Sequence, residues 1–313
     1  MHKKINYLIM FLVVLSLNFV FFYNVDIVRA NNGKIIYVGG SGSGNYSSIQ
    51  NAISESDDGD FIFVYSGNYS ENIIINKSVS LFGINKKNVT IYGNDGLYSV
   101  LVKSSNVNIS GFTIEKGNVG ILLSGSDCKF CNITNNLIYS NFEAIRMTNT
   151  SKNNVNNNLF FRISSIGIVL YESSDNFILN NTFIELNKAI FLGRWSNNNI
   201  IAKNNITDYS YGIHLDYSFK NQILNNLIKN GDFGVYLTSS NNNTISNNLI
   251  GYNNQIGIYT ISADENNIAE NIFEENNKDI GKKSRPPDIK TPGFDILFVL
   301  IAILFITFVK KYK

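Results

Sequence analysis

Charge is scarce and nearly balanced in this chain of 313 residues. Charged residues make up 16% of the sequence and the formal net charge is +2, whereas about a quarter of a soluble domain is usually charged. Binding to nucleic acid or to a strongly acidic ligand normally needs a clear basic excess. The composition therefore predicts neither kind of partner.

Side chains that hold metal ions are equally few. The sequence contains two His, two Cys and three Met, which are scattered along the chain. Copper sites use these side chains in groups, and zinc sites usually need four ligands. We therefore predict no metal and no cofactor. Cys128 and Cys131 form a CxxC pair, for which we expect a local disulfide or two buried thiols outside the cytoplasm.

Asparagine takes the place of the missing charge, with about fifty residues in the chain. Such a sequence could be of low complexity and unable to fold. However, apolar residues amount to 44% and aromatic residues to 13%, which is enough to build a core. The composition therefore predicts a globular domain.

Residues 1–30 have the pattern of a secretory signal peptide. A basic start is followed by a long apolar run and a small-residue end at Ala30, as in signal peptides that are cleaved after export. An uncleaved anchor is the alternative, because the apolar run is long. Either reading places the following residues outside the cytoplasm.

A second apolar segment lies at 292–313, after a predicted linker at 283–291. Its uninterrupted apolar run, Ile296 to Val309, is shorter than the roughly 20 residues that span a bilayer comfortably. The lysine-rich end that follows is expected on the cytoplasmic side. The segment therefore predicts attachment to the membrane, with the domain at 31–282 on its extracellular face.

The start of this segment carries a recognisable motif. Pro292, Gly293 and Phe294, followed by a short apolar helix and a basic tail, resemble the PGF-CTERM signal of archaeal surface proteins. That resemblance implies that an archaeosortase removes the segment and that the mature protein carries a lipid anchor. A simple tail anchor is the alternative.

An internal repeat of 22 to 24 residues runs through the chain in two registers. The first pattern is GILL at 120, AIRM at 144, GIVL at 167, AIFL at 189, GIHL at 212, GVYL at 234 and GIYT at 257. The second is NNLI at 135, NNLF at 157, NNTF at 180, NNIT at 204, NNLI at 225 and 247, and ENIF at 270. A fixed period of this length is the signature of a solenoid.

The repeat favours a parallel β-helix over other solenoids. Its segments alternate at the period of a strand and lack a helical stripe, and the regular leucines of leucine-rich repeats are missing. We predict an all-β, right-handed single-stranded parallel β-helix with three short strands per coil. One aliphatic column should lie inside: Ile121, Ile145, Ile168, Ile190, Ile213, Val235 and Ile258. The second Asn of each NN pair is expected at a bend, with stacked amides bonded along the column.

The N-terminal end should be closed by a short helix. Ser47, Ser48, Ile49 and Gln50 suggest a capping box, with Ile49, Ala52 and Ile53 on one face. This stretch, Gly59-Asp60 and the turn from Gly67 to Glu71 resemble NosD-type and pectate-lyase-like β-helix proteins, over about residues 34 to 280. The resemblance implies the fold and, for NosD, copper handling, which the few scattered His, Cys and Met residues do not support.

One outer face of the predicted helix is a candidate binding surface. Its predicted residues are Arg146, Tyr171, Phe191, Arg194, His214, Asp216, Tyr236 and Tyr259. His214 is expected between the rings of Phe191 and Tyr236. Asp216 lacks a carboxylate on either neighbouring coil, and Arg194 is expected between Glu172 and Asp216, so no residue is assigned a catalytic role.

Two classes of function follow from this reading. The first is a non-catalytic surface protein that serves the cell envelope or adhesion. The second is a protein that binds or modifies extracellular polysaccharide with the aromatic and arginine-bearing outer face. The membrane and envelope components are the expected partners.

Overall fold

The computed structural model describes residues 33–94 and 96–284. The predicted signal peptide, the Pro292-Gly293-Phe294 motif and nearly all of the predicted linker lie outside these residues. No helix in the described part of the chain is both long and apolar enough to cross a membrane.

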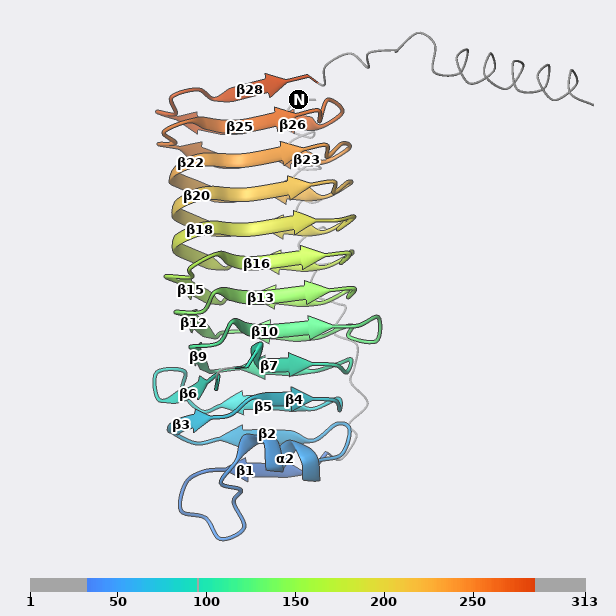
Figure 1. The fold of residues 1–313 in the computed structure, drawn as a ribbon, viewed down its shortest axis with the longest axis vertical. Helices are drawn as coiled ribbons and strands as arrows, with labels where there is room; N and C mark the ends of the chain where they lie inside the picture. Colours follow the sequence, from blue (N-terminus) through green and yellow to red (C-terminus); the bar gives the residue numbers. More distant parts are fainter. Residues whose placement is uncertain (1–32, 95, 285–313) are drawn as a thin grey trace, which may run out of the picture.

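The chain winds into a parallel β-solenoid of about 11 turns, as the repeat predicts (Figure 1). One face is an 11-stranded sheet in which every neighbouring pair is parallel. Its strands are β1 (Ile35–Val38), β2 (Phe61–Val64), β5 (Ser80–Gly83), β8 (Asn108–Ser110), β11 (Asn132–Thr134), β14 (Asn154–Asn156), β17 (Phe177–Leu179), β19 (Ile200–Ala202), β21 (Gln222–Leu224), β23 (Thr244–Ser246) and β26 (Asn267–Ala269).

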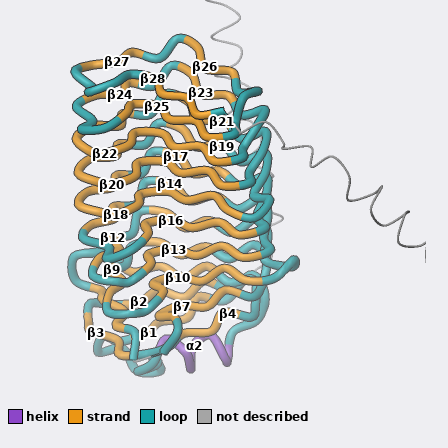
Figure 2. Tube along the Cα trace, turned by 45° about the horizontal axis from the view of Figure 1, so that its top comes forward, coloured by secondary structure: helices purple, strands orange, loops and turns teal. Residues whose placement is uncertain are grey.

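The remaining faces form a 17-stranded sheet that bends around the core (Figure 2). One run of short strands contains β3 (Gly67–Ser70), β6 (Val89–Tyr92), β9 (Thr113–Glu115), β12 (Leu137–Tyr139), β15 (Leu159–Phe161), β24 (Leu249–Gly251) and β27 (Ile272–Glu274). The other run contains β4 (Ile73–Ile75), β7 (Tyr98–Val102), β10 (Val119–Ser124), β13 (Glu143–Thr148), β16 (Ile166–Tyr171), β25 (Ile256–Ile261) and β28 (Ile280–Lys283).

Three coils depart from the predicted pattern of three strands, because their second and third strands merge. The merged strands are β18 (Thr182–Gly193), β20 (Asn205–Asp216) and β22 (Leu227–Thr238). Their corner residues Leu186, Tyr209 and Gly231 stay paired in register, so the ladder continues around the bend. These coils also carry most of the aromatic outer face.

The predicted inner column is confirmed. Its seven aliphatic residues pair in register from coil to coil and none is exposed to solvent. Parallel columns from the other faces, such as those through Ile133 and Ile138, are also fully buried. Burying these stacked side chains provides the main driving force for folding.

Two ladders of asparagine side chains run along the solenoid, and all members except the last of each ladder, Asn266 and Asn271, are buried. One consists of Asn136, Asn158, Asn181, Asn204, Asn226, Asn248 and Asn271, and the other of Asn153, Asn176, Asn199, Asn221, Asn243 and Asn266. In each step the backbone N–H of one Asn donates to the Oδ1 of its equivalent in the next coil, over 2.8 to 3.0 Å. The predicted stacking of amides is therefore confirmed.

The bend, however, was predicted at the wrong Asn of the pair. The first residue has the positive φ, as in Asn135 with 55° and Asn157 with 56°, whereas the second forms the ladder. The NNIT motif at 204 starts one residue later in the repeat than the other NN motifs. Its first residue, Asn204, is the ladder residue, and the preceding Lys203 makes the bend. Asn is common at the bend because it tolerates the left-handed region, but Lys203 shows that it is not essential.

The predicted capping helix is confirmed as α2 (Ile49–Glu55), which covers the N-terminal end of the stack (Figure 1). Ile49, Ala52 and Ile53 are its buried residues. Ser48 is the N-cap, but the distant Glu71 provides the capping carboxylate, accepting from the backbone N–H groups of Ile49 and Gln50 over 2.9 Å. The acidic residue of the Gly67–Glu71 turn therefore has a structural use.

Candidate functional site

Six rings cover the outer face of four consecutive coils, and we call them the aromatic surface. They belong to Phe191, Tyr211, His214, Phe233, Tyr236 and Tyr259. The strands β18, β20, β22 and β25 carry them in paired registers, so that each ring meets the ring of the next coil. All six side chains are half-buried, which leaves part of each in contact with solvent.

His214 lies at the centre of the aromatic surface, as predicted. Its ring centroid is 5.0 Å from that of Phe191 and 4.9 Å from that of Tyr236, both edge to face. Tyr211 stacks against the imidazole at 5.5 Å. Such pairs stabilise stacked strands beyond simple area burial. The ladder is therefore part of the fold as well as a surface.

The two arginines of the predicted face gather on one ring. The guanidinium groups of Arg146 and Arg194 lie 5.8 and 5.6 Å from the centroid of Tyr171, close enough for cation–π attraction. Arg146 is also held by a two-pronged ion pair with Glu143, with both N–O distances 2.7 Å. Tyr171 meets Phe191 edge to face at 5.9 Å, which joins this group to the aromatic surface.

The predicted ion-pair ladder through Arg194 is wrong. None of the ion pairs formed by the described residues includes Arg194, Glu172 or Asp216. The cation that acts on Asp216 is Lys188, and burial raises the pKa of the Asp216 carboxyl against the attraction of that ammonium. Arg194 instead lies over the Tyr171 ring, from a turn in which its φ is 50°.

Lys188 was not identified from the sequence. Its ammonium lies 5.1 Å from the centroid of Phe191 and 5.2 Å from that of Tyr211, and burial lowers its pKa, partly offset by Asp216. In its column it pairs with Ile166 and Tyr211, and the other members are Glu143, Phe233 and Ile256. A Lys between an aliphatic and an aromatic residue of this column is the signal that could have revealed it.

The His214 imidazole is held in its neutral form. Burial, together with the nearby Lys188 ammonium, lowers its pKa from 6.5 to about 4. Its Nδ1 atom is buried and has no hydrogen-bond partner among the residues that the structure describes. A base with so low a pKa binds a proton weakly at neutral pH, so the ring acts here mainly as an aromatic surface.

The stability of the domain is expected to fall between pH 6.5 and pH 4. The unfolded chain binds the His214 proton at a pKa near 6.5, above the folded value of about 4, so acid favours the unfolded state. The loss should approach about 3 kcal/mol. Urea unfolding at pH 7 and pH 4.5 measures it, and His214→Phe, which keeps the ring contacts, should remove most of this loss. An unchanged pH dependence in that variant would contradict the assignment.

A one-residue insertion lies beside the aromatic surface. The turn from Leu192 to the ladder residue Asn199 is one residue longer than the equivalent turn from Leu215 to Asn221. The insertion places Trp195, the only tryptophan of the chain, on the surface with its side chain 62% exposed. Counting turn lengths would have revealed it in the sequence.

The backbone at this insertion is unusual. Arg194 and Trp195 are consecutive residues with positive φ, at 50° and 67°, a conformation that costs non-glycine residues energy. Tyr217, in the turn of the next coil, has φ 47° and is 52% exposed. The Phe219 ring lies 6.0 Å from the indole. Together these residues form an exposed aromatic ridge at the edge of the aromatic surface.

The cysteine pair lies in the core as two thiols. Cys128 and Cys131 are fully buried and their Sγ atoms are 3.9 Å apart. Of the two expected states the structure therefore has the buried thiols. The hydrogen bond to Cys131 and burial both raise the pKa of Cys128, which leaves that thiol unreactive.

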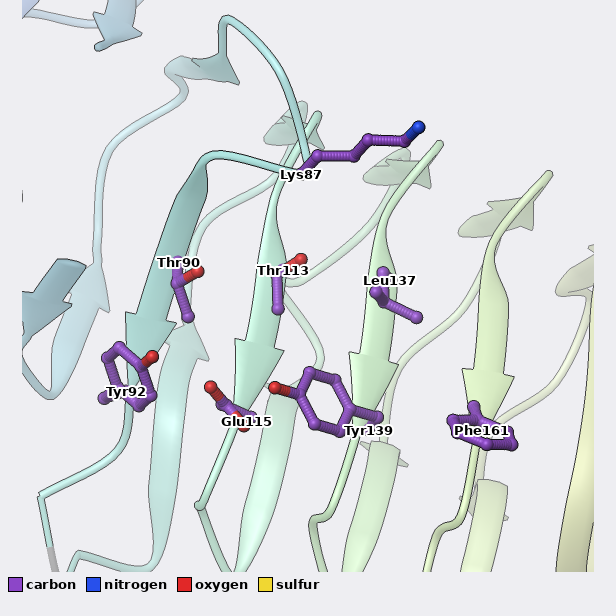
Figure 3. Close-up of a pocket in the computed structure, with 8 residues that line it drawn as sticks. All are labelled: Lys87, Thr90, Tyr92, Thr113, Glu115, Leu137, Tyr139 and Phe161. Carbon is purple, nitrogen blue, oxygen red and sulfur yellow. The ribbon is translucent and has the colours of Figure 1, made fainter. Parts of the chain in front are cut away.

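A groove lined by both polar and apolar side chains lies on a different set of coils, where the sequence repeat did not indicate it (Figure 3). It has a volume of about 440 Å³ and is lined by Lys87, Thr90, Tyr92, Thr113, Glu115, Leu137, Tyr139 and Phe161. Tyr92, Glu115, Tyr139 and Phe161 form one column at the ends of β6, β9, β12 and β15. We call it the Glu115 groove. Its coils precede most of the regular repeats, so the repeat does not align their outward columns.

Comparison with known families identifies the fold's relatives. The family model of the periplasmic copper-binding protein NosD matches residues 24–232 and 196–289. A cell surface glycoprotein of Methanothermus fervidus is 35% identical over 102 residues, which are 32% of this chain and 17% of the glycoprotein. The chain thus matches less than a fifth of that relative's length.

Several solved structures share the solenoid. Tailspike protein 2 of an Escherichia coli bacteriophage matches with a TM-score of 0.55 and 12% identity, over 78% of this chain and 41% of its own. XylC in complex with xylose matches with a TM-score of 0.54 and 12% identity, over 75% of this chain and 70% of XylC. The A-module of the Azotobacter vinelandii mannuronan C-5 epimerase AlgE4 matches with a TM-score of 0.51 and 13% identity, over 80% of this chain and 100% of the A-module. At these identities the likeness concerns the fold alone.

The side chains of the described residues are poorly suited to copper. Within residues 33–94 and 96–284, no three His, Cys, Asp or Glu side chains are grouped so that they could hold a metal ion. His214 is enclosed by rings, and the two cysteines are buried in the apolar core. Copper sites need several such ligands around one accessible position. The described residues therefore do not fit a copper site.

Proposed function

The chain belongs to the NosD family, and we propose that this member is an exported surface protein that binds an acidic polysaccharide without cleaving it. The periplasmic family and the cell surface glycoprotein both support a location outside the cytoplasm. Attachment to the outer face of the membrane is part of the proposal and rests on the predicted segment at 292–313.

The observation that carries the proposal is the insertion at Trp195. Two successive non-glycine residues with positive φ cost of the order of 1 to 3 kcal/mol each, and the insertion uses them to expose the largest aromatic side chain of the protein. Exposed rings on a rigid support are suited to the apolar faces of sugar rings. Tyr217 and Phe219 extend this platform onto the next coil.

Lys188 favours an acidic sugar over a neutral one. Its ammonium is half-buried between two rings and forms none of the ion pairs found in the described residues. Burial lowers the pKa of Lys188 by more than the nearby Asp216 raises it, so the protein does not fully replace the water that would stabilise its positive charge. A uronate carboxylate beside the ammonium would provide the missing stabilisation.

The same surface gives little support for catalysis. Cleavage of a glycosidic bond normally uses two carboxyl groups on either side of it. In its column Asp216 pairs with Gly193 and Thr238, so among the described residues this column places no second carboxyl beside it. The neutral His214 is packed among rings. The arrangement is therefore better suited to binding.

Trp195 also provides the test, because it is the chain's only tryptophan. Adding oligogalacturonate to the purified full chain should change the Trp195 fluorescence, and calorimetry should give a dissociation constant. Trp195→Ala should weaken binding about ten-fold, which corresponds to about 1.4 kcal/mol. The matched control is Phe130→Ala, which removes a ring that is 52% exposed, also at positive φ, on an earlier coil. Equal affinities in the two variants would contradict the proposal.

A further inference from the structure

The Glu115 groove has the features of a second binding site, distinct from the aromatic surface. We propose that it binds an uncharged sugar residue, whose hydroxyl groups donate hydrogen bonds to the oxygens of Tyr92, Glu115 and Tyr139. The groove occupies the coils of β6 to β15, whereas the aromatic surface occupies those of β18 to β25. The inference therefore does not depend on binding at the aromatic surface.

The first argument is the direction of the hydrogen bonds in the groove. Glu115 is only 5% exposed, and Figure 3 shows its carboxylate between the hydroxyls of Tyr92 and Tyr139. Hydrogen bonding to Glu115 raises the pKa of Tyr92 and, with burial, raises that of Tyr139 to about 12. Glu115 is an acceptor placed between the two phenols in the register, so each phenol is best oriented with its proton toward the carboxylate, which leaves its oxygen to accept from a ligand. The groove thus offers hydrogen-bond acceptors to a ligand whose groups act as hydrogen-bond donors.

The second argument is the shape of the groove. Leu137 and Phe161 provide an apolar side next to the polar oxygens. The loop between β5 and β6 provides a wall: the Thr113 hydroxyl donates to the Lys86 carbonyl, and the Lys86 ammonium donates to Asn135 Oδ1 over 2.8 Å. A volume of about 440 Å³ lies within the range of small-molecule sites. An apolar side next to the acceptors suits a sugar ring.

The third argument is charge. An acidic sugar would bring its carboxylate against Glu115, which is unfavourable at close range. A cationic ligand would meet Lys87 at the rim and Lys116, whose ammonium lies 4.7 Å from the centroid of the Tyr92 ring. The groove therefore carries charges of both signs, and neither an anionic nor a cationic ligand is favoured throughout it. An uncharged polyhydroxyl ligand is the class that remains.

The test compares neutral and acidic oligosaccharides on the full chain. A panel of neutral gluco-, manno- and galacto-oligosaccharides is titrated by calorimetry alongside oligogalacturonate. At least one neutral oligosaccharide is expected to bind, and Tyr139→Phe should weaken it about five-fold by removing one hydrogen-bonding hydroxyl. Tyr139→Phe should leave the oligogalacturonate affinity unchanged. Trp195→Ala should leave the neutral affinity unchanged.

Three results would overturn the inference. They are no binding by any neutral oligosaccharide of the panel, an unaltered neutral affinity in Tyr139→Phe, and loss of neutral binding in Trp195→Ala. Thermal unfolding of each variant shows that the fold is intact. If Tyr139→Phe does not fold, Leu137→Asn replaces it, because Leu137 lines the groove while its side chain remains partly exposed. Loss of oligogalacturonate binding alone would contradict the proposed function and leave the groove unaffected.

Discussion

Replacing Ile190 with aspartate is expected to unfold the solenoid. Ile190 is fully buried and pairs with Ile168 below it and Ile213 above it in the inner column. A carboxylate there has no cation or donor to compensate it, and burying an unpaired charge costs several kcal/mol or more. Natural domains are stable by only about 5 to 15 kcal/mol. Circular dichroism and urea unfolding of Ile190→Asp should show a loss of most of the folded population.

The matched change on the outer face is Thr238→Asp. Thr238 points outward on β22, next to Asp216 in the register. The new carboxylate stays in contact with water and meets one like charge, so the expected loss is below about 1 kcal/mol. Similar losses in the two variants would show that the inward and outward columns are wrongly assigned.

Replacing Asn204 with leucine is expected to lower the free energy of unfolding by about 3 to 5 kcal/mol. The two side chains have similar size, so the change mainly removes hydrogen bonds. Asn204 donates from Nδ2 to the Ile178 carbonyl over 2.9 Å, and its Oδ1 accepts the backbone N–H of Asn181 over 2.9 Å. Leucine leaves the Asn181 N–H buried and without this acceptor, and it removes the side-chain donor from the Ile178 carbonyl, which keeps its place in the sheet ladder. Urea unfolding at neutral pH measures the loss.

The neighbouring Asn205 provides the control. Its side chain is exposed at the start of β20, so Asn205→Leu should change stability by about 0.5 kcal/mol or less. The pair also tests the register, because the NNIT motif starting at 204 does not itself show which Asn is buried. A larger effect at Asn205 than at Asn204 would contradict the ladder.

The solenoid and its inward columns could be predicted from the sequence because they repeat. Ile121 and Ile258 are separated by 137 residues yet occupy the same column, since each coil adds one period. The capping helix could be predicted from its polar start and apolar face. The position of His214 between Phe191 and Tyr236 followed from the same alignment.

The details that failed depend on backbone conformation, which the repeat does not specify. Both residues of an NN pair tolerate a bend, so the sequence could not show that Asn135 turns while Asn136 is buried. Arg194 has an acid on each neighbouring coil, yet it lies over the Tyr171 ring. The Glu115 groove depends on the loop that contains Lys86, whose path over the next coils has no repeat counterpart.

The asparagine ladders show how many residues of sequence separate the partners of each contact between coils. Their bonds join residues that are 22 or 23 positions apart, as in Asn204 with Asn226 and Asn181 with Asn204. Relative to the 313 residues of the chain, this separation is about 0.07, a value typical of fast-folding helical bundles. The entropy lost on closing each coil is therefore small and the same from one coil to the next. Although every strand pair is parallel, a coil can form as soon as its predecessor exists, without waiting for the far end of the chain.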